Sequence, residues 1–214
     1  MIIFPQKLKD HKQFLGGKTL SLGVLMEYGF NVPPFVAIPS SHVSKIISSD
    51  HKVDEILIDK IYQEIISEFP CEKYAVRSSA LIEDSKESAY AGQFETKIDQ
   101  SKEQLGEAII QVTQQAHKFL KGNLSDFSLL IQQYIPADFA GVVFTRSPLG
   151  GREMILEFVE GKGEDLVSGN ENSQKIKFYW HQNDIKEILP GLKTAIESFK
   201  KIEGLVAKKQ AARP

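Results

Sequence analysis

Beyond Gly122 the sequence changes from helix-like to strand-like patterning, and this change constrains the fold more than any other feature. Four β-rich runs follow one another there, SLLIQQYI, AGVVFT, EMILEFVE and KIKFYW, separated by Gly, Pro, Asn and Asp residues. Such runs favour strands that pair through short connections, so this stretch predicts a mostly antiparallel sheet. Upstream, residues 53–67 and 102–120 carry apolar side chains at helical spacing on one face. The order of these segments predicts an α+β or mixed α/β chain.

At 214 residues the chain has room for one large domain or for two small lobes with a proper core, and the segment order favours two lobes. In the first, residues 16–29 predict a short helix that ends at Gly29, and the following prolines lead into a strand, FVAIP. We place the lobes at residues 1–98 and 99–214, with a soft boundary between 98 and 125. A cleft between two lobes is a favoured place for a small ligand.

Charge and cysteine content exclude several classes of protein. The 26 basic and 28 acidic residues give a formal net charge of -2, so no field of one sign would attract nucleic acid or an anionic membrane. No apolar run approaches the roughly 20 residues that a bilayer span needs. The single cysteine, Cys71, cannot form an internal disulfide. We therefore expect a cytoplasmic protein without nucleic-acid or membrane partners.

The Gly16-Gly17-Lys18-Thr19 cluster has the composition of a phosphate-binding loop but not the spacing of a Walker A motif. That motif needs a glycine five positions before its second glycine, where this chain has Lys12. A lysine after two glycines can still reach a phosphate, helped by the N–H groups and positive dipole end of the following helix. The alternative is a helix-entry turn with a solvated lysine.

The stretch VRSSALIEDSKESAYAGQFET, residues 76–96, is a loop of small and polar residues between two strand-like segments. Its hydroxyl and backbone N–H groups could bind phosphate oxygens, while Arg77 could supply a bidentate cationic contact. The alternative is a polar surface loop in which Arg77 pairs with Glu83 or Asp84. Spacing alone does not separate these two interpretations.

Two later segments complete the set of candidates. LLIQQYIPADFAGVVFT reads as two strands with a break at Pro136, either an adenine-side strand pair or an ordinary hairpin. LEFVEGKGEDLVSG places Glu157, Glu160 and Glu164 among glycines, where carboxylates could hold Mg²⁺ or simply form a solvated turn. The five histidines are scattered, and none stands in a recognisable catalytic or metal-binding motif.

Taken in order, these segments resemble the ATP-binding domain of the phosphoenolpyruvate synthase, pyruvate phosphate dikinase and rifampicin phosphotransferase family. GGKTLSLGVLMEYGFNVPPFVAI resembles its opening, and VRSSALIEDSKESAYAGQFET its arginine-containing signature. IQQYIPADFAGVVFTRSPLGG resembles its adenine-side strands, and EFVEGKGEDLVSG a glycine-x-glycine-glutamate segment. The four matches cover about residues 14–169.

The resemblance implies an ATP-grasp-like fold that binds ATP, with Mg²⁺, between its lobes. It implies that the first lobe carries the phosphate-contacting catalytic residues, Lys18 and Arg77, and that the second carries the adenine-side strands. The other nucleotide-site positions that it implies are Gly92, Thr96, Gln132, Gln133, Tyr134 and Ile135. The family is a kinase family that moves the β-phosphoryl group of ATP to a histidine of a swivelling domain and then to pyruvate or another acceptor. AMP and phosphate are released.

The sequence also departs from the family pattern. The family continues with a strand carrying aspartate-x-glutamate, the metal ligand, and then glutamine-x-arginine-proline. Here the sequence reaches QAARP without a clear acidic strand, and Gln210 and Arg213 echo the closing motif with one alanine too many. Metal ligands therefore stay unassigned, and we expect a lobe truncated before the metal-binding strand. The swivelling domain would act in cis, outside this sequence, or in trans. The alternative is a degenerate module that binds a nucleotide or a partner without catalysis.

Overall fold

The computed structural model describes residues 1–48, 50–80, 94–144, 150–151, 153–161 and 174–179. The chain divides into two compact units, residues 1–135 and 136–214, and each is described by itself.

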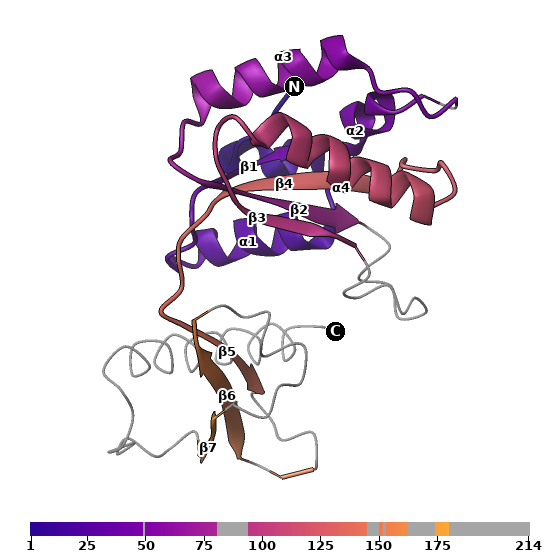
Figure 1. Cartoon of the computed structure of the whole chain (residues 1–214). Coiled ribbons are helices and arrows are strands. Elements are labelled where there is room, and N and C mark those ends of the chain that lie inside the picture. Colours follow the sequence, from indigo (N-terminus) through magenta and orange to yellow (C-terminus); the bar gives the residue numbers. More distant parts are fainter. Residues whose placement is uncertain (49, 81–93, 145–149, 152, 162–173, 180–214) are drawn as a thin grey trace. The chain divides into compact units, whose positions relative to one another are not determined.

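A four-stranded antiparallel sheet forms the centre of the first unit (Figure 1). Its strands lie in the order β1-β4-β2-β3, so the last strand in the chain, β4, is inserted between β1 and β2. Their bounds are β1 Phe35–Ile38, β2 Tyr74–Ala80, β3 Thr96–Gln100 and β4 Phe127–Gln133. The six residues of β4 from Phe127 to Gln132 are all buried, as befits a central strand with both faces covered.

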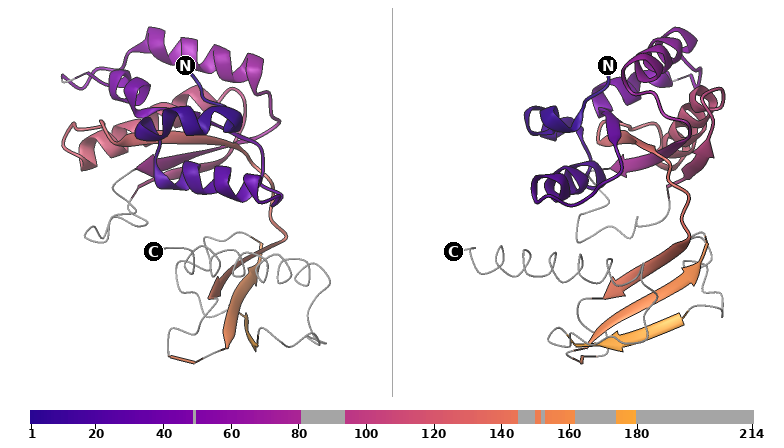
Figure 2. Two further views of the ribbon diagram at one scale, coloured as in Figure 1. Left: turned by 180° about the vertical axis from the view of Figure 1, so that it is seen from behind. Right: turned by 90° about the vertical axis from the view of Figure 1, so that its left-hand side faces the viewer.

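Helices cover both faces of this sheet. Figure 1 shows α3 and α4 over one face, and Figure 2 shows η1 and α1 side by side on the other. The bounds are η1 Pro5–Phe14, α1 Gly17–Glu27, α2 Ser40–Ile46, α3 Glu55–Glu68 and α4 Leu105–Phe119. The 3-10 helix η1 is kinked at His11, whose backbone leaves the helical region. Asp54 caps α3, because its side chain accepts a hydrogen bond from the Leu57 N–H at 2.9 Å.

The two sheet faces carry separate cores because strand side chains alternate between faces. Ile131 and Val76 point toward α2, α3 and α4 and join the larger core, which includes Ile61 and Ile109. Leu130 points the other way, into a smaller core with residues of η1 and its surroundings. Each core is thus built from apolar side chains of the helices on one side and of the strands on the other.

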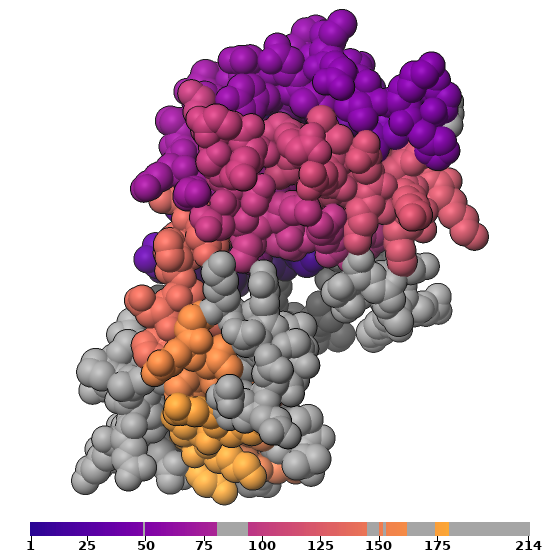
Figure 3. Space-filling model, viewed as in Figure 1, coloured from indigo at the N-terminus to yellow at the C-terminus, as the bar shows by residue number. Residues whose placement is uncertain are grey.

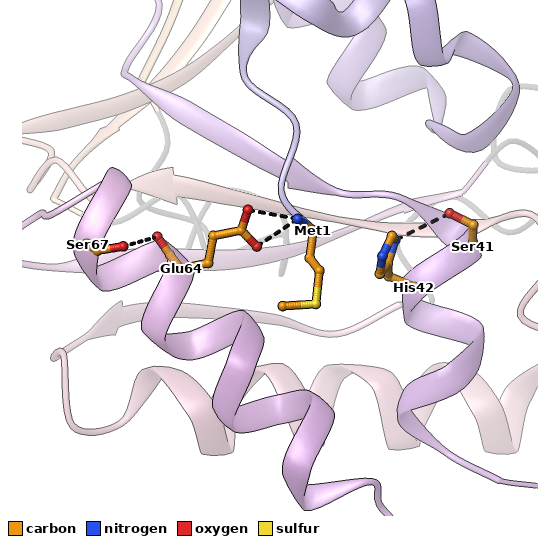
Figure 4. A network of polar contacts seen from close by, with 5 residues as sticks. All are labelled: Met1, Ser41, His42, Glu64 and Ser67. Atoms are coloured by element: carbon orange, nitrogen blue, oxygen red, sulfur yellow. Dashed lines mark hydrogen bonds and ion pairs between the residues drawn. The ribbon is translucent and has the colours of Figure 1, made fainter.

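The larger core is bordered by an ion pair. The Met1 ammonium lies 2.7 Å from the Glu64 carboxylate on α3, and Ser41 and His42 lie on the neighbouring α2 (Figure 4). The Ser41 hydroxyl and the His42 Nδ1 atom are 3.4 Å apart. This arrangement surrounds His42 with both positive and negative charge.

The second unit contains a three-stranded antiparallel sheet in the order β5-β6-β7, and atoms of β6 and β7 are seen in Figure 3. The strands are β5 Phe139–Phe144, β6 Met154–Glu160 and β7 Gln174–Phe178. Their shared buried face is built from Met154, Leu156, Phe158 and Phe178. On the opposite face, Glu157 pairs with Lys175 at 3.2 Å across neighbouring strands.

The α+β class with antiparallel sheets is confirmed, but the position of β4 differs from the prediction. We expected all four β-rich runs to form one sheet in the second lobe. The first run instead pairs with β1 and β2, far upstream in the chain, and the other three form the second sheet. The division between units therefore falls after Ile135 rather than at residues 98–99. It coincides with the break at Pro136. The sequence also predicts a helix over roughly residues 192–208, a stretch that lies outside the described residues.

Candidate functional site

The N-terminus of α1 lies directly on the backbone of β2. A β-carbon placed on Gly16 would overlap the carbonyl group of Ser79 and lie 2.7 Å from the Ala80 nitrogen. Both obstacles are backbone atoms of a paired strand, so neither can turn aside as a flexible side chain could. Position 16 therefore requires glycine. The first glycine of the Gly-Gly-Lys cluster is explained by close packing of helix against strand.

Three buried hydroxyl groups fasten the start of α1 to the sheet. The Gly16 N–H donates to Ser128 Oγ at 3.0 Å, and Ser128 Oγ donates to the Ser79 carbonyl at 2.6 Å. Ser79 Oγ accepts from both the N–H and the hydroxyl of Thr19, at 3.2 and 3.0 Å. Ser79 and Ser128 are directly paired across β2 and β4. The sequence suggested that N–H groups at the start of this helix could bind a phosphate. The Thr19 N–H, however, already has a protein acceptor.

Lys18 lies between these anchored residues and has an exposed side chain. Its Nζ atom is 3.4 Å from the Ser78 hydroxyl on β2. Ser78 directly follows Arg77 in the chain, so the structure brings the lysine of the first motif to the strand that carries the arginine of the second. Residues 18 and 77 are separated by most of the first unit in sequence.

Arg77 is the one exposed residue of β2, whose other six residues are buried. It pairs directly with Thr96 on β3 and with Leu130 on β4. Residues directly opposite in an antiparallel pair have their β-carbons about 4.5–5.5 Å apart on the same face. Arg77 and Thr96, two of the expected site residues, are therefore neighbours.

Sheet register shows which face they occupy. Leu130, opposite Arg77, belongs to the core on the η1 and α1 side. Arg77 and Thr96 therefore lie on the face that α1 covers in part, and Gln132, two positions after Leu130, lies there as well. The register thus places Arg77, Thr96 and Gln132 on one side of one sheet, the side on which α1 lies, whereas Ser78, which the Lys18 ammonium contacts, alternates to the other face. Gln133 alternates to the other face.

The segment from Gln132 to Ile135 is anchored to the start of β1 and to the residue before β2. Gln132 is 8% exposed, and its Nε2 donates to the Pro33 carbonyl at 3.3 Å. The N–H groups of Gln133 and Tyr134 donate to the carbonyls of Pro34 and Lys73, at 2.9 and 3.0 Å. These two N–H groups already have protein partners, whereas the Ile135 side chain is 54% exposed. A ligand could bind these two N–H groups only by displacing their protein acceptors.

The expected acidic and loop positions are only partly described. Gly92, Glu83 and Asp84 lie outside the described residues, as does Glu164. Glu157 is described and is held by Lys175. Within the described part of the chain, no three His, Cys, Asp or Glu side chains are grouped so that they could hold a metal ion. Mg²⁺ therefore stays a prediction, since it is commonly bound by only one or two carboxylates together with substrate phosphates.

The perturbed acid–base groups lie away from Lys18 and Arg77. Burial, then the positive charges of the Met1 ammonium and Lys45, lowers the pKa of His42, against a smaller opposing effect of Glu64. Burial raises the pKa of the Cys71 thiol. Burial likewise raises that of the Tyr74 phenol. Cys71 and Tyr74 pack with the larger core, on the other face of the sheet. We assign none of these groups to ligand chemistry.

Comparison with known proteins now decides the family. Residues 50–210 match the family described as the pyruvate phosphate dikinase AMP/ATP-binding domain. The chain belongs to this family. The match spans Arg77, Thr96 and Gln132, whereas Lys18 lies before it. This pyruvate phosphate dikinase family match also confirms the expected ATP-grasp-like class.

Relatives of this dikinase family member include phosphotransferases from bacteria and archaea. It is 25% identical to an uncharacterized phosphotransferase, YvkC, of Bacillus subtilis, over 79% of this chain and 24% of the relative. It is 29% identical to the prodigiosin synthesizing transferase PigC of Serratia marcescens, over 76% and 21%. It is 25% identical to a phosphoenolpyruvate synthase of Aeropyrum pernix, over 75% and 26%. The chain thus spans about a quarter of the length of these relatives. Among its described residues, no helix is long and apolar enough to cross a bilayer.

Sequence reasoning missed the buried hydroxyls of Thr19 and Ser128. The only available signal was a serine at the start of an otherwise apolar run, SLLI, which gives no indication of its partner. In the sequence, Ser79 is one of several small polar residues of the 76–96 stretch, and nothing there indicates its partner. The structure shows that its hydroxyl faces Thr19 of α1.

Proposed function

We propose that this chain is the ATP-binding module of a dikinase-type phosphotransferase, in which Lys18 and Arg77 contact the phosphates of ATP. The observation that carries the proposal is the exposed guanidinium of Arg77 on an otherwise buried strand, beside Thr96 and next to the residue that Lys18 reaches. The Arg77 side chain is exposed, so a ligand can reach it. A phosphate supplies the planar, bidentate partner that a guanidinium fits best.

The remaining positions follow from the same face of the sheet. Thr96 would place a hydroxyl beside the phosphates. Gly92, outside the described residues, would line the site from the loop before β3. Gln132 and the backbone through Gln133, Tyr134 and Ile135 would lie beside the adenine, where the partly exposed end of the segment leaves carbonyl groups for the base. Phosphoryl transfer depends mostly on positioning and on neutralising charge, which is what two fixed cations supply.

We further propose that the β-phosphoryl group passes to a histidine of a swivelling domain, in cis or in trans, and then to pyruvate or another acceptor. Support comes from the family match and from relatives named phosphotransferase and phosphoenolpyruvate synthase. In this scheme the chain itself binds and orients the triphosphate, and the histidine nucleophile comes from outside it.

Calorimetry with ATP, in the presence and absence of Mg²⁺, tests the binding step. We expect Arg77→Ala to weaken binding at least about tenfold, because a hydrogen bond to a charged group contributes roughly 1.5–3 kcal/mol. Lys60→Ala is the matched control, since Lys60 is an exposed cation on α3, across the sheet from α1. Equal affinities of the wild-type chain and Arg77→Ala would refute the assignment.

Labelled ATP tests the transfer step separately. The chain is incubated with ATP labelled at the β-phosphorus, alone and together with a histidine-containing domain of a relative. Labelled phosphohistidine together with AMP supports catalysis. Binding without either product would leave the module as a nucleotide-binding domain that does not catalyse transfer, which was the alternative function raised by the sequence.

A further inference from the structure

We propose that Thr19, Ser79 and Ser128 are positioning residues, which hold Lys18 in place relative to Arg77 through buried hydrogen bonds. This inference rests on the proposed function, because it concerns where two phosphate-contacting cations are held. The three side chains come from α1, β2 and β4, and each is 0% exposed. A buried hydroxyl is costly unless it is hydrogen-bonded, and all three of these take part in the bonds that join α1 to the sheet.

The first step is that α1 is capped from outside its own segment. Gly16, the N-cap residue, offers no side chain, and no local side chain makes the usual capping bond. The N–H of Thr19, the third residue of the helix, is satisfied by Ser79, which is 60 positions away in the chain. A local cap would stabilise the helix but leave it free to shift over the sheet. A cap supplied by β2 stabilises the helix only in one position.

A second anchor fixes the direction of the helix as well as its position. The Gly16 N–H is bonded to Ser128 on β4, while Thr19 is bonded to Ser79 on β2. Two anchors, three residues apart on the helix and on adjacent strands, prevent the first turn from rotating about either one. Ser128 also donates to the Ser79 carbonyl at 2.6 Å, so the two anchors are tied to each other.

Lys18 is the residue most affected by these anchors. It lies between Gly16 and Thr19, and Arg77 lies two residues before Ser79 on the same strand. The buried hydrogen bonds between Thr19 and Ser79 therefore connect the backbone next to Lys18 with the strand that carries Arg77. Groups that bind a transferring phosphate must be held closely, and a displacement of about 1 Å can cost up to a hundredfold in rate. Fixing the relative position of two cations is a role that this network can perform.

The competing explanation is that the hydroxyls only stabilise the docking of α1. Substitutions at Thr19 separate the two roles. Thr19→Val keeps the shape and removes the hydroxyl, whereas Thr19→Ser keeps the hydroxyl and removes a methyl group. Thr113→Val is the matched control, because Thr113 is also 0% exposed and its hydroxyl donates to the Ile109 carbonyl at 2.7 Å, within α4 on the other face.

The experiment measures ATP affinity by calorimetry and thermal stability for each variant. Thr19→Val should bind ATP at least about fivefold more weakly, Thr19→Ser should bind like the wild type, and Thr113→Val should lose stability without losing affinity. Because Thr19 acts through Lys18, adding Thr19→Val to Lys18→Ala should cause no further loss. Unchanged affinity of Thr19→Val, in a chain where Lys18→Ala weakens binding, would overturn the inference and leave the proposed function intact.

Amide hydrogen exchange gives a readout that needs no nucleotide. The Gly16 and Thr19 N–H groups should be protected in the wild type, although N–H groups in a first helical turn usually exchange quickly. Ser128→Ala should speed exchange at Gly16 by at least about tenfold. Unprotected amides in the wild type would show that the network is absent. Failure of the wild type to bind ATP, with both amides protected, would instead overturn the proposed function and with it the positioning role, and the network would then be structural.

Discussion

Replacement of Gly16 by alanine tests the close contact between α1 and β2. The new methyl group would overlap the Ser79 carbonyl group, and the nearby Ala80 nitrogen belongs to the same paired strand. The helix would have to withdraw, which strains or breaks the bonds from Gly16 to Ser128 and from Thr19 to Ser79. Overpacking costs about 1–3 kcal/mol and each lost hydrogen bond about 0.5–1.5 kcal/mol. The expected loss is therefore about 2–6 kcal/mol.

Thermal and urea unfolding of the full chain measure this loss. For a unit of 135 residues, 1 kcal/mol corresponds to roughly 3–5 °C in Tm, so we expect a fall of about 6–30 °C. Gly106→Ala is the matched control, because the added β-carbon in α4 would meet only Ile58 Cγ2, at 4.0 Å. That variant should gain up to about 0.5–1 kcal/mol, since glycine in a helix is less favourable than alanine. Wild-type stability of Gly16→Ala would refute the close-packing explanation.

Two further predictions concern groups on the other face of the sheet. The pKa of His42 is lowered by burial and then by the Met1 ammonium and Lys45, so the folded state binds fewer protons than the unfolded state. The stability that neutral His42 contributes should be fully present above the unfolded-state pKa of about 6.5 and should fall as the pH drops below it. In His42→Gln, the free energy of unfolding from urea titrations should depend less steeply on pH between about 5 and 7. Equal pH dependence in the two proteins would contradict this. Tyr74→Phe should lose about 1–3 kcal/mol, because it leaves the Cys71 N–H, 2.9 Å from the phenol oxygen, without that partner; unchanged urea unfolding would contradict it.

Local patterns in the sequence predicted most of the helices in the first unit. The apolar spacing of residues 53–67 and 102–120 corresponds to α3 and α4, and Gly29 follows α1 with a φ of 74°, which favours glycine. These features depend on side chains within a few positions of each other, which a single sequence displays directly. The 3-10 helix η1 had no comparable signal, since its ten residues leave only Leu8 buried.

Strand pairing over long distances could not be predicted in the same way. The run SLLIQQ is apolar enough to be a buried strand in either sheet, and nothing local shows that it pairs with β1 and β2 rather than with β5. Because of this ambiguity, the sequence predicts the boundary between the units at residues 98–99, whereas the structure has it after Ile135. The hydroxyl contacts to α1 were hidden for the same reason, because they join residues 60 and 112 positions apart.

The Gly-Gly-Lys motif therefore combines two requirements that its sequence does not separate. Gly16 is required by contact with β2 and would be needed whether or not a nucleotide binds. The Lys18 side chain is exposed, and its ammonium lies 3.4 Å from the Ser78 hydroxyl. Under the proposed function, Lys18 contacts a phosphate from a position two residues after a glycine that packing demands. Ser79 and Arg77 differ in the same way. The Ser79 hydroxyl accepts a hydrogen bond from Thr19 inside the protein, whereas the Arg77 side chain, two residues earlier, is exposed.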